Sequence, residues 1–162
     1  MIENHGEFVI VSLNVSAATG TRKKPVESFV LEEGRGVSGD AHAGLIEERQ
    51  VSFLAVEEIE RASAALKPGS CALALGEGGL KPGDFAENIT TRGIELHLLP
   101  LGTRLLIGDV VLEVSKIGKE CHAACEIRAL VGDCVMPRKG IFARVVSGGE
   151  VRREDRCHYR IG

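Results

Sequence analysis

Short apolar runs separated by turn-forming residues dominate the second half of the sequence. Three such runs cover residues 95–98, 103–107 and 110–117, and Pro100, Gly102 and the Gly108-Asp109 pair separate them. Runs of this length that are rich in β-branched residues predict strands. The connections are too short for crossover helices, so the pattern favours antiparallel pairing. A further strand is predicted over residues 141–146, with a hairpin turn at 147–150 leading into 151–153.

The first half of the chain adds further strands and one clear helix. Strands are predicted over residues 8–15, 29–31, 49–54 and 85–90. Residues 55–66 contain good helix formers, with Val56, Ile59 and Leu66 roughly on one side, and Pro68-Gly69 ends this helix. A helical turn is predicted over 126–131, and the basic run at 22–24 is expected to face solvent.

These elements together indicate a mainly β fold. Many short strands, one or two short helices and 20 glycines favour a largely antiparallel barrel, closed or half-closed. The helix at 55–66 should cover one opening or face of this barrel. Neither an internal repeat nor a linker interrupts the pattern, so residues 1–162 are interpreted as a single domain.

Composition and charge narrow the function classes. A hydrophobic content of 44% permits a packed core without disulfides, and five cysteines without an export signal favour reduced thiols and a cytoplasmic location. Aromatic residues make up only 4%, the net charge is −3 and no basic stripe occurs, so nucleic acid is not an expected partner. No apolar stretch approaches the length that spans a membrane, so no membrane association is expected.

The most informative stretch runs from residue 110 to residue 125. A predicted strand ends at Gly118, and Lys119, Cys121 and His122 follow at once. A strand that delivers a cysteine onto a loop holds the thiol on a rigid scaffold and leaves it reachable. The nearby lysines favour the thiolate, which attacks electrophiles and binds metals. The alternative is that Cys121 is a small buried apolar residue.

Two further cysteines follow this thiol. Cys125 and Cys134 could join Cys121 and His122 in a zinc site, but the spacing departs from the usual knuckle, and no second pair follows. Cys125 or Cys134 could instead serve as a resolving thiol for Cys121, or simply pack in the interior. Cys71 and Cys157 are interpreted as incidental.

Several polar residues elsewhere are candidates for binding an anion. The glycine-rich segment 34–44 contains Asp40 and His42, which either cap a turn or face a cleft. The planar guanidinium groups of Arg49 and Arg144 suit phosphate or molybdate oxygens, although a solvent-facing role is the alternative for both. Asn88 and Thr90 lie two apart on one predicted strand and share a face, so that they line a pocket or bond across strands. The sequence thus offers His42, Arg49, Asn88, Thr90, Lys119, His122 and Arg144 as binding residues.

Several blocks of the sequence resemble a known family when taken in order. They are GVSGDAHAG, RQVSFLA, GDFAENITTRGIEL, LPLGTRLLIGDVVLEVSKIGKECH and GIFARVVSGG. In this order they resemble the MOSC domain, named for the C-terminal domain of the eukaryotic molybdenum-cofactor sulfurase, in its short stand-alone bacterial type. The likeness is strongest over residues 34–149. The end of the chain, VRREDR at 151–156, departs from the usual family pattern.

The resemblance implies a β-barrel and a role around the molybdenum cofactor. The hallmark cysteine of the family matches Cys121, which in cofactor-carrying relatives ligates molybdenum and in a sulfur-carrier role would hold a persulfide. Asn88 matches the region that relatives use for pterin or phosphate contacts. Lys119, His122 and Arg49 would favour the thiolate of Cys121 and neutralise the ligand.

Three functions therefore stay open at the level of sequence. The leading one is a protein of cofactor biosynthesis or sulfuration that binds a molybdopterin-type or oxyanion ligand and carries sulfur or molybdenum on Cys121. A sulfur carrier would need a pyridoxal-phosphate cysteine desulfurase or molybdopterin biosynthesis proteins as partners. The alternatives are a small molybdenum-dependent reductase of N-hydroxylated compounds and a non-catalytic molybdate or pterin binder. No segment resembles a flavin site or an iron–sulfur site.

Overall fold

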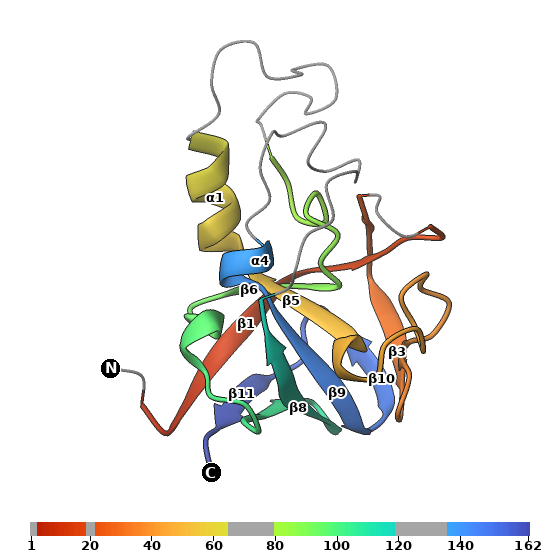
Figure 1. Cartoon of the computed structure of the whole chain (residues 1–162), viewed down its shortest axis with the longest axis vertical. Coiled ribbons are helices and arrows are strands. Elements are labelled where there is room, and N and C mark those ends of the chain that lie inside the picture. Colours follow the sequence, from red (N-terminus) through yellow and green to blue (C-terminus); the bar gives the residue numbers. More distant parts are fainter. Residues whose placement is uncertain (1–2, 19–21, 65–79, 119–135) are drawn as a thin grey trace.

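Seven strands close into a barrel in the part of the chain that the structure, a computed structural model, describes: residues 3–18, 22–64, 80–118 and 136–162 (Figure 1). β1 pairs with both β11 and β6, which closes the ring in the order β1-β11-β7-β8-β9-β5-β6. Among these neighbours β5 and β6 run parallel and the other pairs are antiparallel. The barrel strands are β1 (His5–Val15), β5 (Val51–Ala55), β6 (Ile89–Arg92), β7 (Arg104–Ile107), β8 (Val110–Ile117), β9 (Ile141–Ser147) and β11 (Cys157–Arg160).

Shorter elements surround the barrel. β2 (Lys24–Val26) extends β1, while β10 (Gly149–Arg152), β3 (Ser28–Glu32) and β4 (Gly36–Val37) form a separate three-stranded sheet. The helix α1 (Val56–Ala64) follows β5 directly and packs against β5 and β6, as Figure 1 shows at one end of the barrel. The other helical turns among the described residues are η1 (Glu47–Arg49), η2 (Leu96–Leu98) and α4 (Met136–Lys139). Within the described residues, no helix has the length and apolar character needed to span a bilayer.

Alternating side chains fill the barrel interior. Along β8, Val110, Leu112 and Val114 are buried, whereas the residues between them are partly exposed. This period-two pattern directs one face of each strand inward. The buried cluster contains residues of all seven barrel strands, so the interior is a packed core. The face that remains outside is therefore available for a site.

The predicted mainly β barrel is confirmed, and it is fully closed. The strand over 110–117 is present with those bounds, and the strand over 8–15 begins three residues earlier, at His5. The predicted strand over 49–54 covers Val51–Ala55, because Arg49 belongs to η1. The helix predicted over 55–66 is present as α1, and residues 65–79 and the helical turn predicted over 126–131 lie outside the described residues.

Three local predictions are wrong, each for a structural reason. The strand predicted over 85–90 begins only at Ile89, because Ala86 has a positive φ of 64° that interrupts extended backbone. Residues predicted as the strand 95–98 form the 3₁₀ turn η2 instead. The hairpin predicted at 147–150 does not form, since β10 pairs with β3 instead of β9. At Gly148 a Cβ atom would lie 2.4 Å from the carbonyl oxygen of Leu31, so glycine permits this crossing.

Candidate functional site

The candidate site lies on the outer face of the barrel, where η1 packs against β8 and β9. Phe53 of β5 points into the core, so the preceding Ser52 points outward. Ser52 stands opposite Phe142 in the antiparallel pair of β5 and β9. The Ser115 hydroxyl donates to the carbonyl of Glu48 at 2.7 Å and thereby ties η1 to β8. This arrangement encloses a pocket between the sheet and the segment that precedes β5.

The pocket brings three predicted residues together from distant parts of the sequence: His42, Arg49 and Asn88. Its volume of about 100 Å³ accommodates several water molecules or a group the size of phosphate. Most of its wall is apolar, and the polar groups stand at a few points, as is usual for ligand sites. The full lining is His42, Leu45, Ile46, Arg49, Ser52, Ala86, Asn88 and Phe142.

Arg49 offers an unused donor in this pocket. Its guanidinium carbon lies 5.8 Å from the centroid of the Phe142 ring, which is within cation–π range. Its Nε is buried and has no hydrogen-bond partner among the described residues. A buried donor without an acceptor is costly, so an acceptor supplied by a ligand would satisfy it. Arg49 is therefore the side chain most clearly available to an anion.

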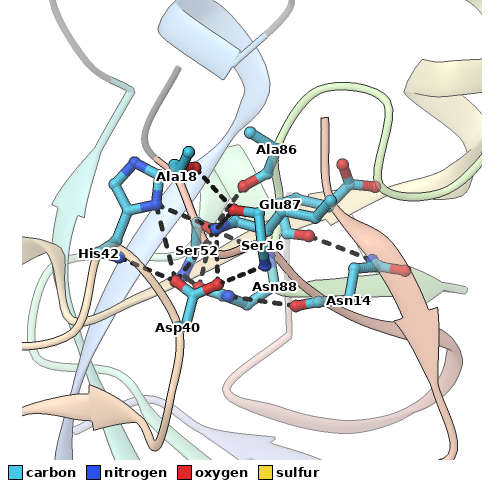
Figure 2. Close-up of polar contacts among 10 residues, drawn as sticks. Asn14, Ser16, Ala18, Asp40, His42, Ser52, Ala86, Glu87 and Asn88 are labelled. Carbon is cyan, nitrogen blue, oxygen red and sulfur yellow. Dashed lines mark hydrogen bonds and ion pairs between the residues drawn. The ribbon is translucent and has the colours of Figure 1, made fainter. Parts of the chain in front are cut away.

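Ser52 and Asn88 join the parallel neighbours β5 and β6 below the pocket (Figure 2). The backbone N–H and the hydroxyl of Ser52 both donate to Asn88 Oδ1, each at 3.1 Å. In return, the backbone N–H of Asn88 donates to Ser52 Oγ at 2.9 Å. The Asn88 side-chain amide donates to the carbonyl of Asn14 at 3.2 Å. This leaves one amide hydrogen of Asn88 without a hydrogen bond among the described residues. Asn88 thus both holds the pocket floor and lines it.

Thr90 lies behind this floor and does not line the pocket. Its side chain is fully buried, donates to Glu87 Oε2 at 2.7 Å and accepts from Asn14 Nδ2 at 3.1 Å. The sequence predicts that Asn88 and Thr90 share a face of one strand, but Asn88 precedes β6, which begins at Ile89, and among the described residues the two have only Asn14 as a common partner. The structure places Thr90 as a link between β1 and β6 in this buried polar network.

Glu87 is a buried acid that the sequence analysis did not single out. Burial raises the pKa of Glu87 to about 7, although hydrogen bonds from the Gly83 N–H and the Thr90 hydroxyl lower it. Its other oxygen, Oε1, has no partner among the described residues. Glu87 is therefore easier to protonate near neutral pH than an ordinary carboxyl. Nothing in the sequence around Glu87 indicated that its carboxyl group would be buried.

A buried ion pair supports His42 at the pocket rim. Lys23 Nζ lies 2.8 Å and 3.0 Å from the two carboxylate oxygens of Asp40, 3.1 Å from Ser16 Oγ and 3.0 Å from His42 Nδ1. The Lys23 side chain has no exposed area. The expectation that the whole basic run 22–24 faces solvent is therefore wrong for Lys23, because its charge is matched inside the fold by Asp40. Lys24, the next residue, is exposed.

Asp40 is the anionic partner in this arrangement. Burial alone would raise the pKa of Asp40, but hydrogen bonds from His42, Lys23 and Ser16, together with the Lys23 charge, hold it well below its usual range. The backbone N–H groups of Ser16 and His42 donate to its two oxygens at 3.0 Å and 3.1 Å. The sequence predicts that segment 34–44 either caps a turn or faces a cleft. It does both, because Asp40 caps the turn and His42 lines the pocket.

Arg144 lies on the same outward face of β9 as Phe142, two residues away. It stands opposite Glu113 of β8. Its Nε is buried and has no hydrogen-bond partner in the described part of the chain. It does not line the pocket described above. Arg144 is a second cation on the outer side of the sheet that carries the site.

The predicted thiol site lies outside the described residues. Lys119, Cys121 and His122, together with Cys125 and Cys134, fall within 119–135, and Cys71 falls within 65–79. Among the described residues, no group of three His, Cys, Asp or Glu side chains is arranged to hold a metal ion. The roles of Cys121 as nucleophile or metal ligand, of Lys119 and His122 as binding residues, and of Cys125 or Cys134 as a resolving thiol stay predictions from the sequence.

Fold and pocket together define a small closed-barrel protein with a pocket on its outer face that is lined by Arg49. The family model of the MOSC domain matches residues 38–158, so the chain belongs to the MOSC domain family, which is associated with the molybdenum cofactor. A search of curated protein sequences finds no match.

Solved structures show the same fold at low sequence identity. The YUAD protein of Bacillus subtilis aligns with a TM-score of 0.73 and 17% identity, covering 98% of each chain. YiiM of Geobacillus stearothermophilus aligns with a TM-score of 0.65 and 19% identity, covering 94% of this chain and 74% of that one. YiiM of Escherichia coli gives 0.64 and 16%, with 95% and 69% covered.

Proposed function

We propose that this protein binds an oxyanion group of a molybdenum-cofactor-type ligand in the pocket of His42, Arg49 and Asn88, and that Cys121 carries sulfur or ligates molybdenum beside it. The ligand group would be the phosphate of molybdopterin or the oxygens of a molybdenum centre. The observation that carries the proposal is the buried Arg49 Nε, which lacks an acceptor among the described residues although it stands over Phe142 in a pocket.

The residues present fit such a ligand. Arg offers a planar fork of N–H donors that suits phosphate-like oxygens, and the pocket volume suits one such group. The apolar walls formed by Leu45, Ile46 and Phe142 lower the local dielectric, which strengthens charged hydrogen bonds. A whole pterin exceeds this volume, so the ring system of the ligand would lie outside the described pocket. The cofactor, when bound, would supply the molybdenum chemistry.

Strand β8 supports the assignment of Cys121 to the same site. Lys116 of β8 stands opposite Phe142, which lines the pocket, and Gly118 donates its N–H to the carbonyl of Gly140 at 2.7 Å. The chain therefore leaves the barrel beside the pocket wall, and Cys121 follows three residues later in the sequence. Lys119 and His122 flank this thiol in sequence and would favour its thiolate.

Sulfur transfer to this thiol needs a donor protein. In the proposed step, the Cys121 thiolate attacks the outer sulfur of a persulfide on a pyridoxal-phosphate cysteine desulfurase. A new S–S bond forms on Cys121, the S–S bond of the donor breaks, and the donor leaves as a thiolate. No oxidant is consumed, because the sulfane sulfur only changes its carrier. Arg49 and His42 would meanwhile hold the anionic acceptor.

The oxyanion part of the proposal is tested by calorimetric titration with molybdate and with inorganic phosphate. We expect Arg49→Ala to weaken binding at least about ten-fold and Arg49→Lys to recover only part of it, because lysine lacks the fork. Arg156→Ala is the matched control, since that side chain is 87% exposed and does not line the pocket. Unchanged affinity in Arg49→Ala would remove Arg49 from the site.

The thiol part is tested by mass spectrometry of protein purified without oxygen. Incubation with a cysteine desulfurase and cysteine should add one sulfur, and Cys121→Ser should abolish the addition. Sulfur uptake by the serine variant would contradict the carrier role. Near-stoichiometric molybdenum with a pterin would instead favour the molybdenum-dependent reductase, and molybdate binding with neither sulfur uptake nor a pterin would favour the simple binding protein.

A further inference from the structure

The buried ammonium group of Lys23 is placed to control the imidazole of His42. Lys23 Nζ lies 3.0 Å from His42 Nδ1 and is held there by both oxygens of Asp40 and by Ser16 Oγ. The side chains of Lys23 and Asp40 are 0% and 1% exposed. Water therefore does not compete with these contacts, and the position of the ammonium group is fixed by the fold.

The direction of this contact follows from the chemistry of the ammonium group. Lys23 Nζ has three hydrogens for four partners, so one hydrogen is shared between two of them, and the two oxygens of the Asp40 carboxylate are suited to share it. An ammonium group has no acceptor, so His42 Nδ1 accepts from Lys23. Nδ1 then carries no hydrogen, and a neutral ring carries its proton on Nε2. Asp40 Oδ2 lies 3.6 Å from Nδ1, beyond hydrogen-bond distance, so it does not draw the proton to Nδ1. It accepts instead from the backbone N–H of His42 at 3.1 Å.

We propose that Lys23 is a positioning residue of the pocket, which fixes His42 in the tautomer that carries its proton on Nε2 and so makes His42 a hydrogen-bond donor to the ligand. Figure 2 shows the second ring nitrogen of His42 on the edge away from Asp40. The His42 side chain is 35% exposed and lines the pocket with Arg49. The inference rests on the proposed oxyanion site and adds how that site selects its ligand.

A pocket in which His42 donates favours ligands that carry hydrogen-bond acceptors. The Nδ1 lone pair of His42 is occupied by Lys23, and Nε2 carries a hydrogen, so the ring has no free lone pair for a metal or for a proton. His42 and Arg49, which both line the pocket, then offer N–H donors from two different side chains. Oxygens of phosphate or molybdate match this set, whereas a cation does not. His42 is thereby assigned as a donor and not as a general base.

The tautomer is measured directly by long-range ¹H–¹⁵N correlation spectra of histidine-labelled protein without ligand, at about pH 8 where an imidazole is neutral. In the wild-type protein, we expect the Nε2 shift of His42 to be that of a protonated nitrogen and the Nδ1 shift that of an acceptor. The reverse pattern would overturn the proposal. This readout does not depend on whether any oxyanion binds.

Substitution tests whether Lys23 is the cause. Lys23→Met should let His42 exchange between tautomers and should weaken molybdate and phosphate binding about two-fold from the smaller share of the Nε2–H tautomer, and further because a buried positive charge is lost. Because Lys23→Met leaves Asp40 without its charge partner, the double variant Lys23→Met/Asp40→Asn supplies a neutral site that is expected to fold. Lys24→Met, at the exposed neighbouring position, is the matched control and should match wild type.

The outcomes separate the two proposals. A fixed Nε2–H tautomer in a folded Lys23→Met or double variant would overturn the role of Lys23. Wild-type protein that shows this tautomer but binds neither molybdate nor phosphate would contradict the proposed function and leave the control of His42 by Lys23 in place. Unchanged anion affinity in both variants, with Arg49→Ala impaired, would overturn His42 as a donor to the ligand.

Discussion

Asn14 and Asn88 each donate a hydrogen bond to the backbone carbonyl of the other, although 74 positions separate them in the sequence. The Asn14 N–H donates to the Asn88 carbonyl at 2.7 Å, and the Asn88 side-chain amide donates to the Asn14 carbonyl at 3.2 Å. The Asn14 side chain in turn donates to the Glu87 carbonyl and to Thr90 Oγ1, both at 3.1 Å. The pair therefore fastens the floor of the pocket to β1.

The first prediction concerns the side chain of Asn14. Asn14→Ala removes the partners of three buried polar groups at once, among them the carbonyl of Glu87 and the hydroxyl of Thr90. Unsatisfied buried groups each cost about 1–3 kcal/mol, so we expect the free energy of unfolding to fall by at least about 2 kcal/mol. Urea denaturation measures the loss. Asn4→Ala, at an exposed position, should change stability by less than about 0.5 kcal/mol.

The second prediction is a pH dependence set by Glu87. Its pKa is about 7 in the folded protein against an ordinary value of 4.5, so the folded state holds a proton that the unfolded state has released in this interval. The stability that this group contributes is therefore fully present below about pH 4.5 and is lost as pH rises to about 7. The gap corresponds to roughly 3 kcal/mol. Glu87→Gln should remove this slope, as measured by urea denaturation at a series of pH values.

Two other acidic residues provide the control for the Glu87 measurement and set the pH range in which it should be made. Glu154→Gln, at an exposed position, should keep the wild-type slope. Asp40 contributes with the opposite sign, because its pKa is lowered: its stabilisation is present above its ordinary value of 3.8 and is lost as pH falls further. The comparison therefore belongs above about pH 4.5. An identical slope in wild type and Glu87→Gln would contradict the prediction.

The third prediction compares two glycines with the same backbone. Gly83 and Gly93 have φ values of 91° and 89°, so alanine at either position costs about 1–2 kcal/mol of backbone strain. At Gly83 a Cβ would also lie 2.3 Å from the carbonyl oxygen of Lys23, whereas nothing lies within 4 Å at Gly93. We expect Gly83→Ala to be less stable than Gly93→Ala by at least about 2 kcal/mol in thermal or urea unfolding. Equal losses would mean that the Lys23 segment yields freely.

The fourth prediction concerns Cys157. This residue lies in the core on β11, where burial, and secondarily the charge of Asp155, raise the pKa of its thiol to about 12. In native protein, limiting iodoacetamide should therefore leave Cys157 unlabelled, and peptide mapping should find it alkylated only after denaturation. Cys121 is the proposed thiolate and should be labelled first under native conditions. Rapid native labelling of Cys157 would show that β11 opens readily.

The local sequence pattern was sufficient to predict strands that have one apolar face and one polar face. In β8, apolar residues alternate with partly exposed ones and the Gly108-Asp109 turn precedes them, so both bounds followed from the sequence. The strand pattern and the family resemblance indicated a barrel, closed or half-closed, and only the pairing of β1 with both β11 and β6 shows that it is closed. The same alternation did not reveal β11, because the charged residues at 152–156 hide its beginning, and only pairing with β1 and β7 defines it.

Tertiary structure alone decided which polar residues form the site. The residue types of His42, Arg49 and Asn88 made them candidates, but their convergence depends on the pairing of β5 with β6 and β9. Lys23 stands in a run of three basic residues that no local feature distinguishes, and it is buried because Asp40, seventeen positions away, balances its charge. Sequence determines what a side chain can do, whereas long-range contacts determine whether it is buried, paired or free to bind.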